Sequence, residues 1–237
     1  MVAVMTITYH PEVDQGGKEW LALRCGLLTA SEMKHIITPT LKIADNDKQR
    51  AHLWELLAQR ITGYVEPHYI SDDMLRGMSD EVDARIAYDK HFAPVTSCGF
   101  VTNDEWGFTI GYSPDGLVGE WGLIEAKSRR QRFQIETMVQ HVSIDGGTTI
   151  PADYLIQHQS GLLVTKRQYC DFISYSGGLP MIVLRVYPDD RVQAAIVEAA
   201  AAFEERLQKA RAHYEAALQS GARLIPTERK IEQEMTL

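Results

Sequence analysis

Three residues near the middle of the chain, Asp115, Glu125 and Lys127, have types and spacings that could support metal-dependent chemistry. The run that ends in Glu-Ala-Lys resembles a strand, and strand alternation would place Glu125 and Lys127 on one face with apolar neighbours on the other. Asp115 lies at a Pro-Asp-Gly bend, as far before the turn at Gly119–Trp121 as Glu125 lies after it. A hairpin would therefore make the two carboxylates cross-strand neighbours, with Cβ atoms about 4.5–5.5 Å apart.

This expected pair of carboxylates requires a cation. Two negative charges about 5 Å apart repel by roughly 3 kcal/mol at an effective dielectric constant of about 20, which would force one carboxylate to protonate. Ligands that are all oxygen favour Mg²⁺, with Mn²⁺ as the alternative. Lys127 adds a compact charge that can position a nucleophilic water or stabilise charge developing on a phosphate. Phosphodiester hydrolysis requires such a set of groups.

The alternative interpretation is an ordinary charged face of an edge strand. A Glu-x-Lys motif taken alone favours that alternative because the motif is so short. The upstream Asp115 in hairpin register favours a metal site instead.

The net charge of the chain argues against a nucleic-acid partner. The 237-residue chain has a net charge of −8 and a pI near 5.5, whereas affinity for DNA comes largely from Lys and Arg that neutralise phosphates. The distribution of charge matters as well as the total. Arg129, Arg130 and Arg132 follow Lys127 closely, so we expect this segment to bind DNA.

Length and composition indicate one α/β domain over residues 1–237. We expect an N-terminal helical part at about 17–92, a catalytic part of strands and helices at about 95–220, and a short C-terminal tail. No apolar run approaches the roughly 20 residues that cross a bilayer, and the N-terminus lacks a signal-peptide pattern. A cytoplasmic protein without a membrane partner is therefore expected.

Periodicity and turn residues predict the remaining elements. The capping-box spacing from Thr29 to Glu32 predicts a short helix that begins there and stops before Pro39. Longer helices are expected at about 47–62, 72–91, 152–165 and 189–220, the last as a docked surface helix and not a coiled coil. A meander is expected from Val95–Val101, Trp106–Tyr112 and Gly122–Lys127 and, after a loop rich in Gly and Thr, two more strands at Tyr169–Tyr175 and Met181–Tyr187. This order fits a mixed sheet flanked by helices.

Beyond these patterns, the Pro-Asp and Glu-Ala-Lys pieces resemble the PD-(D/E)xK nuclease superfamily. Further blocks resemble the lambda exonuclease, or YqaJ-type viral recombinase, family, in the same order and over about residues 19–164. They are W-x₃-R-x₄-T-A-S-E at Trp20–Glu32, G-x₃-E at Gly77–Glu81, S-P-D-G at Ser113–Gly116 and Y-x₂-Q-x-Q at Tyr154–Gln159.

The resemblance implies a restriction-endonuclease-like fold and a division of roles at the metal site. Asp115, Glu125 and the Ala126 carbonyl would hold metal, with two metal ions expected per site, and Lys127 would contact the water or phosphate. Glu81 and Gln157 would complete the site. Taken singly, Glu81 could be a solvated helix acid and Gln157 a polar residue of a helix surface.

The resemblance also implies a binding site for a terminal 5′-phosphate, formed by Arg24, Thr29, Ser31 and Ser113. A capped helix start at Thr29 would present free N–H groups to an anion, and Arg24 could grip the anion with two donors. Thr29, Ser31 and Glu32 could equally serve as a helix cap with no ligand.

Some residues depart from the family pattern. Arg76 stands where the family has an aromatic residue before the glycine of G-x₃-E, and Ser160 and Gly161 stand where related RecB-like nucleases often have Tyr. Arg129 and Arg130 directly after Ser128 lead us to expect DNA contacts at this loop that differ from those of relatives.

The predicted function is a magnesium-dependent exonuclease that degrades one strand of linear duplex DNA from its 5′ end. It would release 5′-mononucleotides and leave a 3′ single-stranded overhang. The resemblance further implies a ring-shaped homotrimer around DNA, a phage or prophage origin in a bacterial host, and a single-strand annealing protein as partner.

Two alternatives remain at this stage. One is an endonuclease or Cas4-like nuclease of the same superfamily, although a Cas4-type iron–sulfur cluster needs four cysteines and the chain has only Cys25, Cys98 and Cys170, widely spaced. The other is a DNA-end-binding module that no longer cuts, against which the intact Asp115, Glu125 and Lys127 argue.

Overall fold

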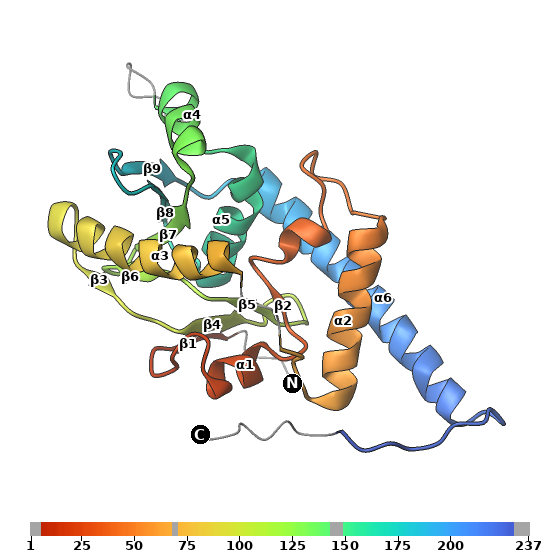
Figure 1. Ribbon diagram of the computed structural model, residues 1–237. Coiled ribbons are helices and arrows are strands. Elements are labelled where there is room, and N and C mark those ends of the chain that lie inside the picture. The colour runs from red at the N-terminus through yellow and green to blue at the C-terminus, as the bar shows by residue number, and fades with distance from the viewer. Residues whose placement is uncertain (1–5, 68–70, 143–148, 230–237) are drawn as a thin grey trace, which may run out of the picture.

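The computed structural model describes residues 6–67, 71–142 and 149–229 and contains two mixed β-sheets with helices around them (Figure 1). The first sheet has the strand order β1-β4-β5-β2 and the second has β3-β6-β7-β8-β9. The strands of the first sheet are β1 Ile7–His10, β2 Leu28–Thr29, β4 Phe100–Asn103 and β5 Ile110–Tyr112. Those of the second are β3 Val95–Thr96, β6 Gly116–Val118, β7 Gly122–Ser128, β8 Tyr169–Tyr175 and β9 Ile182–Val186.

Seven helices lie among the described residues, and capping residues explain the limits of α2 and the start of α3. They are α1 Lys18–Arg24, the 3₁₀ helix η1 Met33–His35, α2 Asp47–Thr62, α3 Asp72–His91, α4 Gln131–His141, α5 Ala152–Thr165 and α6 Asp190–Leu218. Asn46 caps α2 by accepting a hydrogen bond from the Gln49 N–H, and Ser71 caps α3 in the same way. Gly63 ends α2 in the left-handed conformation that glycine adopts without strain.

The helices cover the second sheet on both faces. β7 and β8 are parallel, so the chain between them must cross over, and α4 and α5 make that crossover. α5 packs against β4 and β5 of the first sheet and β8 of the second, while α3 packs on β7 and β8. The larger apolar core includes Leu123 and Phe172, and a smaller one around Tyr88, Ile124 and Ile173 lies under α3.

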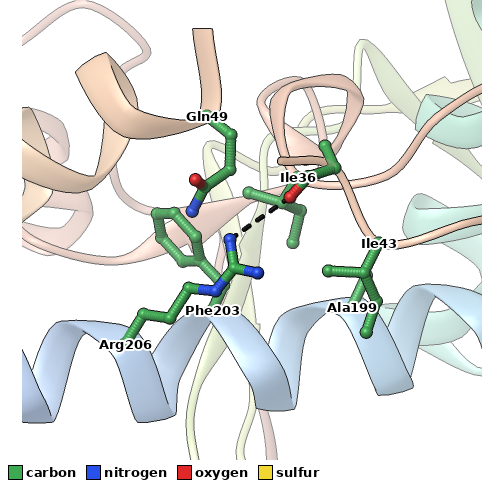
Figure 2. A pocket seen from close by; sticks show the side chains of 7 residues that line it. Ile36, Ile43, Gln49, Ala199, Phe203 and Arg206 are labelled. Carbon is green, nitrogen blue, oxygen red and sulfur yellow. Dashed lines mark hydrogen bonds between the residues drawn. The ribbon is translucent and has the colours of Figure 1, made fainter. Parts of the chain in front are cut away.

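α6 is docked along the body of the protein by its N-terminal half. Its buried residues end at Leu207, and Figure 1 shows the rest of the helix running away from the sheets. Figure 2 shows the contact with the segment around η1, where Arg206 Nη1 donates to the Ala44 carbonyl at 3.3 Å beside Phe203. Among the described residues, no helix combines the length and apolarity needed to cross a membrane.

The α/β class with a mixed sheet flanked by helices is confirmed, but its strands form two sheets. The predicted meander is wrong as one sheet, because the expected strand Val95–Val101 is divided into β3 and β4, which pair in different sheets. The antiparallel pairing of β4 with β5 is confirmed, but β7 lies in the other sheet. The helix expected to begin at Thr29 is also wrong, since Thr29 ends β2, paired in parallel with β5, and only the three-residue η1 follows. β1 and α4 were not predicted. Residues 143–148 of the Gly- and Thr-rich loop and residues 230–237 of the tail lie outside the described residues.

Candidate active site

The hairpin of β6 and β7 brings Asp115 to Glu125 as the sequence predicts. Gly116 pairs with Ile124, and this register continued by one residue sets Asp115 opposite Glu125. Asp115 Oδ2 accepts a hydrogen bond from the Ala126 N–H at 2.6 Å. Because the N–H and C=O of a strand residue point to the same side, the Ala126 carbonyl faces Asp115 as well. The three expected metal-binding groups therefore lie together.

Glu125 is held by donors from three elements. Its side chain is buried, and Oε1 accepts from Lys127 Nζ at 2.7 Å and also from Gln157 Nε2 on α5. Oε2 accepts from the Tyr112 hydroxyl at 2.7 Å. These contacts fix the orientation of the carboxylate, since each donor comes from a different part of the fold.

Tyr112 is a site residue that the sequence analysis did not predict. It is fully buried at the end of β5 and packs against Gly161 of α5, where an added Cβ would lie 2.8 Å from the ring. The close approach of Tyr112 explains why no side chain fits at position 161. The signal in the sequence was the position of Tyr112 directly before the Ser-Pro-Asp-Gly bend.

The site carries more negative than positive charge. Burial, followed by repulsion from Glu125 and Glu81, holds the pKa of Asp115 well above its ordinary value. Burial and repulsion from Glu125 also raise the pKa of Glu81, which α3 brings to the edge of the site. Burial lowers the pKa of Lys127, but attraction to Glu125 and Asp115 outweighs it and raises the pKa above its ordinary value. Three carboxylates thus face the ammonium group of Lys127, and the Arg85 guanidinium acts on Glu81 as well.

This donor set fits a divalent cation with oxygen ligands. Within the described residues, no three Asp, Glu, His or Cys side chains form a close metal-binding group, so side chains alone do not complete a coordination shell. Asp115, Glu125 and the main-chain carbonyl of Ala126 form a partial oxygen shell, and Mg²⁺ commonly keeps several waters beside one or two carboxylates. The excess negative charge gives the physical reason for such an ion to bind.

The residues expected to bind a 5′-phosphate also lie together. Arg24 stacks on Trp20, with its Cζ atom 4.4 Å from the ring centroid, and donates to Thr29 Oγ1 at 3.3 Å. Thr29 Oγ1 lies 3.3 Å from Ser31 Oγ, and Trp20 Nε1 donates to Ser113 Oγ at 2.9 Å. This group is called the Arg24 pocket below. Because Ser113 precedes Asp115 by two residues, the pocket adjoins the metal pair.

Glu32 is the unexpected member of the Arg24 pocket. Thr29 Oγ1 donates to Glu32 Oε2 at 2.6 Å, and Arg24 Nη2 lies 3.8 Å from Glu32 Oε1. Burial lowers the pKa of Arg24, while Glu32 acts to raise it. The expected contribution of a helix start at Thr29 is absent, because no α-helix begins there. Side chains would have to hold an anion in this pocket.

The three arginines after Lys127 occupy different environments. Arg129 is half-buried, donates to the Tyr154 hydroxyl at 2.6 Å and packs on the Phe133 ring. Arg130 is exposed and pairs with Asp73 at 3.0 Å, and Arg132 is exposed beside Phe133. Only Arg130 and Arg132 have the exposure expected of a DNA contact.

Comparisons with known proteins identify the family to which the chain is similar. The YqaJ-like viral recombinase domain matches residues 19–168. The structure of an alkaline exonuclease (LHK-Exo) from Laribacter hongkongensis is similar with a TM-score of 0.72 and 30% identity, covering 86% of this chain and 98% of that one. The same enzyme in complex with dAMP gives a TM-score of 0.72 and 31% identity, covering 86% and 100%.

A phage-related exonuclease from Haemophilus somnus 129PT has a TM-score of 0.57 at 12% identity, covering 82% of this chain and 96% of that one. At that identity the likeness shows the fold alone. None of the curated proteins matches the chain at a significant level.

The fold and the carboxylate–lysine site are those of a PD-(D/E)xK nuclease, a hydrolase that acts on DNA. Within that class, the matched domain covers well over half of the chain. The protein belongs to the YqaJ-like viral recombinase family.

Proposed function

We propose that the protein is a magnesium-dependent exonuclease that degrades one strand of linear duplex DNA from a 5′-phosphorylated end. The observation that carries this proposal is the direct connection between the Arg24 pocket and the metal pair, two residues apart through Ser113 and Asp115. An enzyme that holds a terminal phosphate beside its metal can cut only near an end. The site therefore favours exonucleolytic over internal cleavage.

The chemistry would be shared among this chain's residues. A bound metal ion would supply Lewis acidity and a more acidic water. Asp115, Glu125 and the Ala126 carbonyl would hold the ion, and Lys127 would stabilise charge on the phosphate. Gln157 and Tyr112 keep the Glu125 carboxylate oriented. The expected products are 5′-mononucleotides and a 3′ overhang, and a relative crystallised with dAMP, a nucleoside monophosphate, supports that assignment.

A homotrimeric ring around DNA is the proposed assembly. α3 exposes an apolar stripe, with Leu75, Met78, Val82 and Ile86 each more than half exposed. Such a stripe on a monomer is a surface that a partner or another subunit would cover. The family name supports a role in phage recombination, for which we propose a single-strand annealing protein as partner. Light scattering would determine the subunit number.

The decisive experiment is digestion of linear duplexes that carry 5′-phosphate or 5′-hydroxyl ends, beside closed circles, in Mg²⁺ or EDTA. We expect digestion only of linear DNA, faster with 5′-phosphate, and only with the metal ion. Cleavage of circles at the rate of linear DNA would instead indicate an endonuclease. Full activity in EDTA would disprove the metal mechanism.

Two variants separate binding from chemistry. Lys127→Ala should abolish hydrolysis and keep end binding, while Arg24→Ala should mainly remove the preference for a 5′-phosphate. Arg50→Ala, which changes an exposed arginine of α2, is the matched control. Equal loss of end binding in the Lys127 and Arg24 variants would show that the proposed division of roles is wrong.

A further inference from the structure

A basic hollow lies beside the active site, at the start of α4. Its volume is about 590 Å³, and its walls include Arg76 of α3 and the arginines Arg129, Arg130 and Arg132. One acid, Asp80, also lines it. We call this feature the arginine hollow.

The arginine hollow keeps a positive excess in an acidic protein. Asp73 pairs with both Arg76 and Arg130, and Asp80 lies 3.9 Å from Arg76. Four guanidinium groups thus face two carboxylates, which leaves two positive charges uncompensated, whereas the whole chain carries −8. Arginine clusters of this kind recognise phosphate groups because the planar guanidinium can donate two parallel hydrogen bonds to phosphate oxygens.

Arg130 and Arg132 are accessible to a ligand, Arg130 once it leaves Asp73. Arg76 is tied to Asp73 and Ser128. Arg129 is held by Tyr154 and Thr137 and supports the wall of the hollow. Arg130 and Arg132 are exposed at the N-terminus of α4, where no side chain caps the helix. The free N–H groups of that first turn add to the attraction for an anion.

The position of the arginine hollow relates it to the metal site. Ser128 ends β7 directly after Lys127, and its hydroxyl donates to Asp80 at the wall of the hollow. Ser113 of the Arg24 pocket precedes Asp115 by two residues. The Arg24 pocket and the arginine hollow therefore both adjoin the metal pair.

We propose that the arginine hollow binds backbone phosphates of the DNA away from the 5′ end, as a second anchor that holds the substrate while its end is cut. This inference rests on the proposed exonuclease function and adds a site to it. Arg130 and Arg132 contact the phosphates, and Arg130 exchanges its pairing with Asp73 for the DNA. The site recognises the charge of the DNA backbone and not the base sequence, as phosphate contacts do.

The test measures binding of 5′-phosphorylated DNA by fluorescence anisotropy over a series of salt concentrations, in an inactive Lys127→Ala background with Mg²⁺. The ligands are a long duplex, a 5′-phosphorylated dinucleotide and free dAMP. Added substitutions are Arg130→Gln with Arg132→Gln, and Arg211→Gln as the matched control. Arg211 is an exposed arginine in the C-terminal half of α6, which Figure 1 shows far from α4.

We expect the double substitution to weaken duplex binding for every sequence and to reduce the slope of log affinity against log salt by about 1 for each arginine, about 2 in total. Dinucleotide binding should stay unchanged, because that ligand reaches only the Arg24 pocket. Arg211→Gln should alter neither duplex binding nor dinucleotide binding. Asp73→Asn, which frees Arg130 and Arg76, should act in the opposite direction and tighten duplex binding about threefold, the size expected for an exposed ion pair.

An unchanged salt slope in the double variant would overturn the inference. Equal weakening of the dinucleotide or of dAMP would also overturn it, by assigning the arginines to the end or to the released product. Polyglutamate serves as a fourth ligand; if its binding depends on Arg130 and Arg132 while DNA binding is unaffected, the inference is overturned in favour of an acidic protein partner. Failure of the exonuclease proposal is separate, because it would appear as wild-type protein that does not digest linear DNA.

Discussion

Glu125 on β7 and Asp171 on β8 are buried carboxylates on neighbouring strands, each 2% exposed, yet their surroundings differ. Asp171 is in register with Ile124 and lies on the face covered by α3, where it accepts from the Tyr88 hydroxyl and from Arg185. Glu125 is in register with Phe172 and meets Tyr112, Lys127 and Gln157. Burial and hydrogen bonding alone therefore do not distinguish the roles of these two carboxylates.

The balance of charge separates them. Arg185 neutralises Asp171 with two hydrogen bonds of 2.8 Å, so this pair needs no further cation. Glu125 shares the ammonium group of Lys127 with Asp115 and Glu81, and a second cation, Arg85, acts on Glu81. The uncompensated charge indicates a site that binds a cation, whereas the compensated pair is structural.

The largest expected effect is that of Asp115→Asn on catalysis. Asparagine can still accept the Ala126 hydrogen bond, but it removes a metal ligand and one of the repelling charges. We expect the rate of DNA digestion to fall by about 10²–10³-fold or more, while the free energy of unfolding stays the same or rises. Single-turnover digestion and urea denaturation measure the two quantities. A large loss of stability would mean that Asp115 is structural, like Asp171.

Asp171→Asn should show the reverse pattern. The substitution leaves Arg185 without its bidentate partner and Tyr88 with a weaker acceptor. Because Arg185 is partly exposed, we expect a loss of about 3 kcal/mol in the free energy of unfolding, with digestion per folded molecule retained. Glu198→Gln, an exposed carboxylate on α6, is the control and should be nearly neutral. A loss of activity without loss of stability would contradict the contrast drawn between the two carboxylates.

His158 tests what burial does to a titratable side chain, since burial has the largest effect on its pKa, ahead of Glu125, which raises it, and Lys127, which lowers it. Burial lowers its pKa from 6.5 to about 4, and its Nδ1 atom contacts the Tyr154 carbonyl at 2.8 Å. The unfolded chain binds the proton more readily, so stability should be complete above pH 6.5 and fall as the pH drops towards 4. The contribution is roughly 3 kcal/mol at most.

Urea denaturation of wild type and His158→Gln across this pH range measures that contribution. The variant should lose less stability on acidification than wild type, because glutamine does not titrate. Parallel pH profiles would show that His158 is protonated without cost in the folded protein.

The smallest expected effect is that of Gln157→Ala. Its amide orients Glu125 without being charged, and loss of a group that orients a metal ligand typically costs about 10–100-fold in activity or metal affinity. Digestion rates over a Mg²⁺ series would show the loss, and a higher metal requirement is expected. Gln193→Ala, a second α-helical glutamine that contacts Gln159 and not Glu125, should leave the rate unchanged.

Sequence patterns were sufficient to predict those parts of the structure that depend on residues close together in the chain. The hairpin register that sets Asp115 opposite Glu125 follows from the turn between them. The limits of α2 and α3 follow from caps and periodicity, and those of α5 from periodicity. α4 was not predicted, because no side chain caps its N-terminus and because apolar residues form only a weak stripe along the helix. The roles of the site residues stay predictions until the variants are measured.

The sequence by itself determined the nuclease resemblance, the carboxylate hairpin and most helices, because these depend on residue type and short spacings. Only the tertiary structure decided how consecutive strands divide between two sheets, since strand pairing joins residues distant in the chain. It also decided that Tyr112 and Gln157 reach Glu125, and that Arg129 is packed while Arg130 and Arg132 stay exposed. Such contacts depend on the crossover through α4 and α5, which no local pattern records.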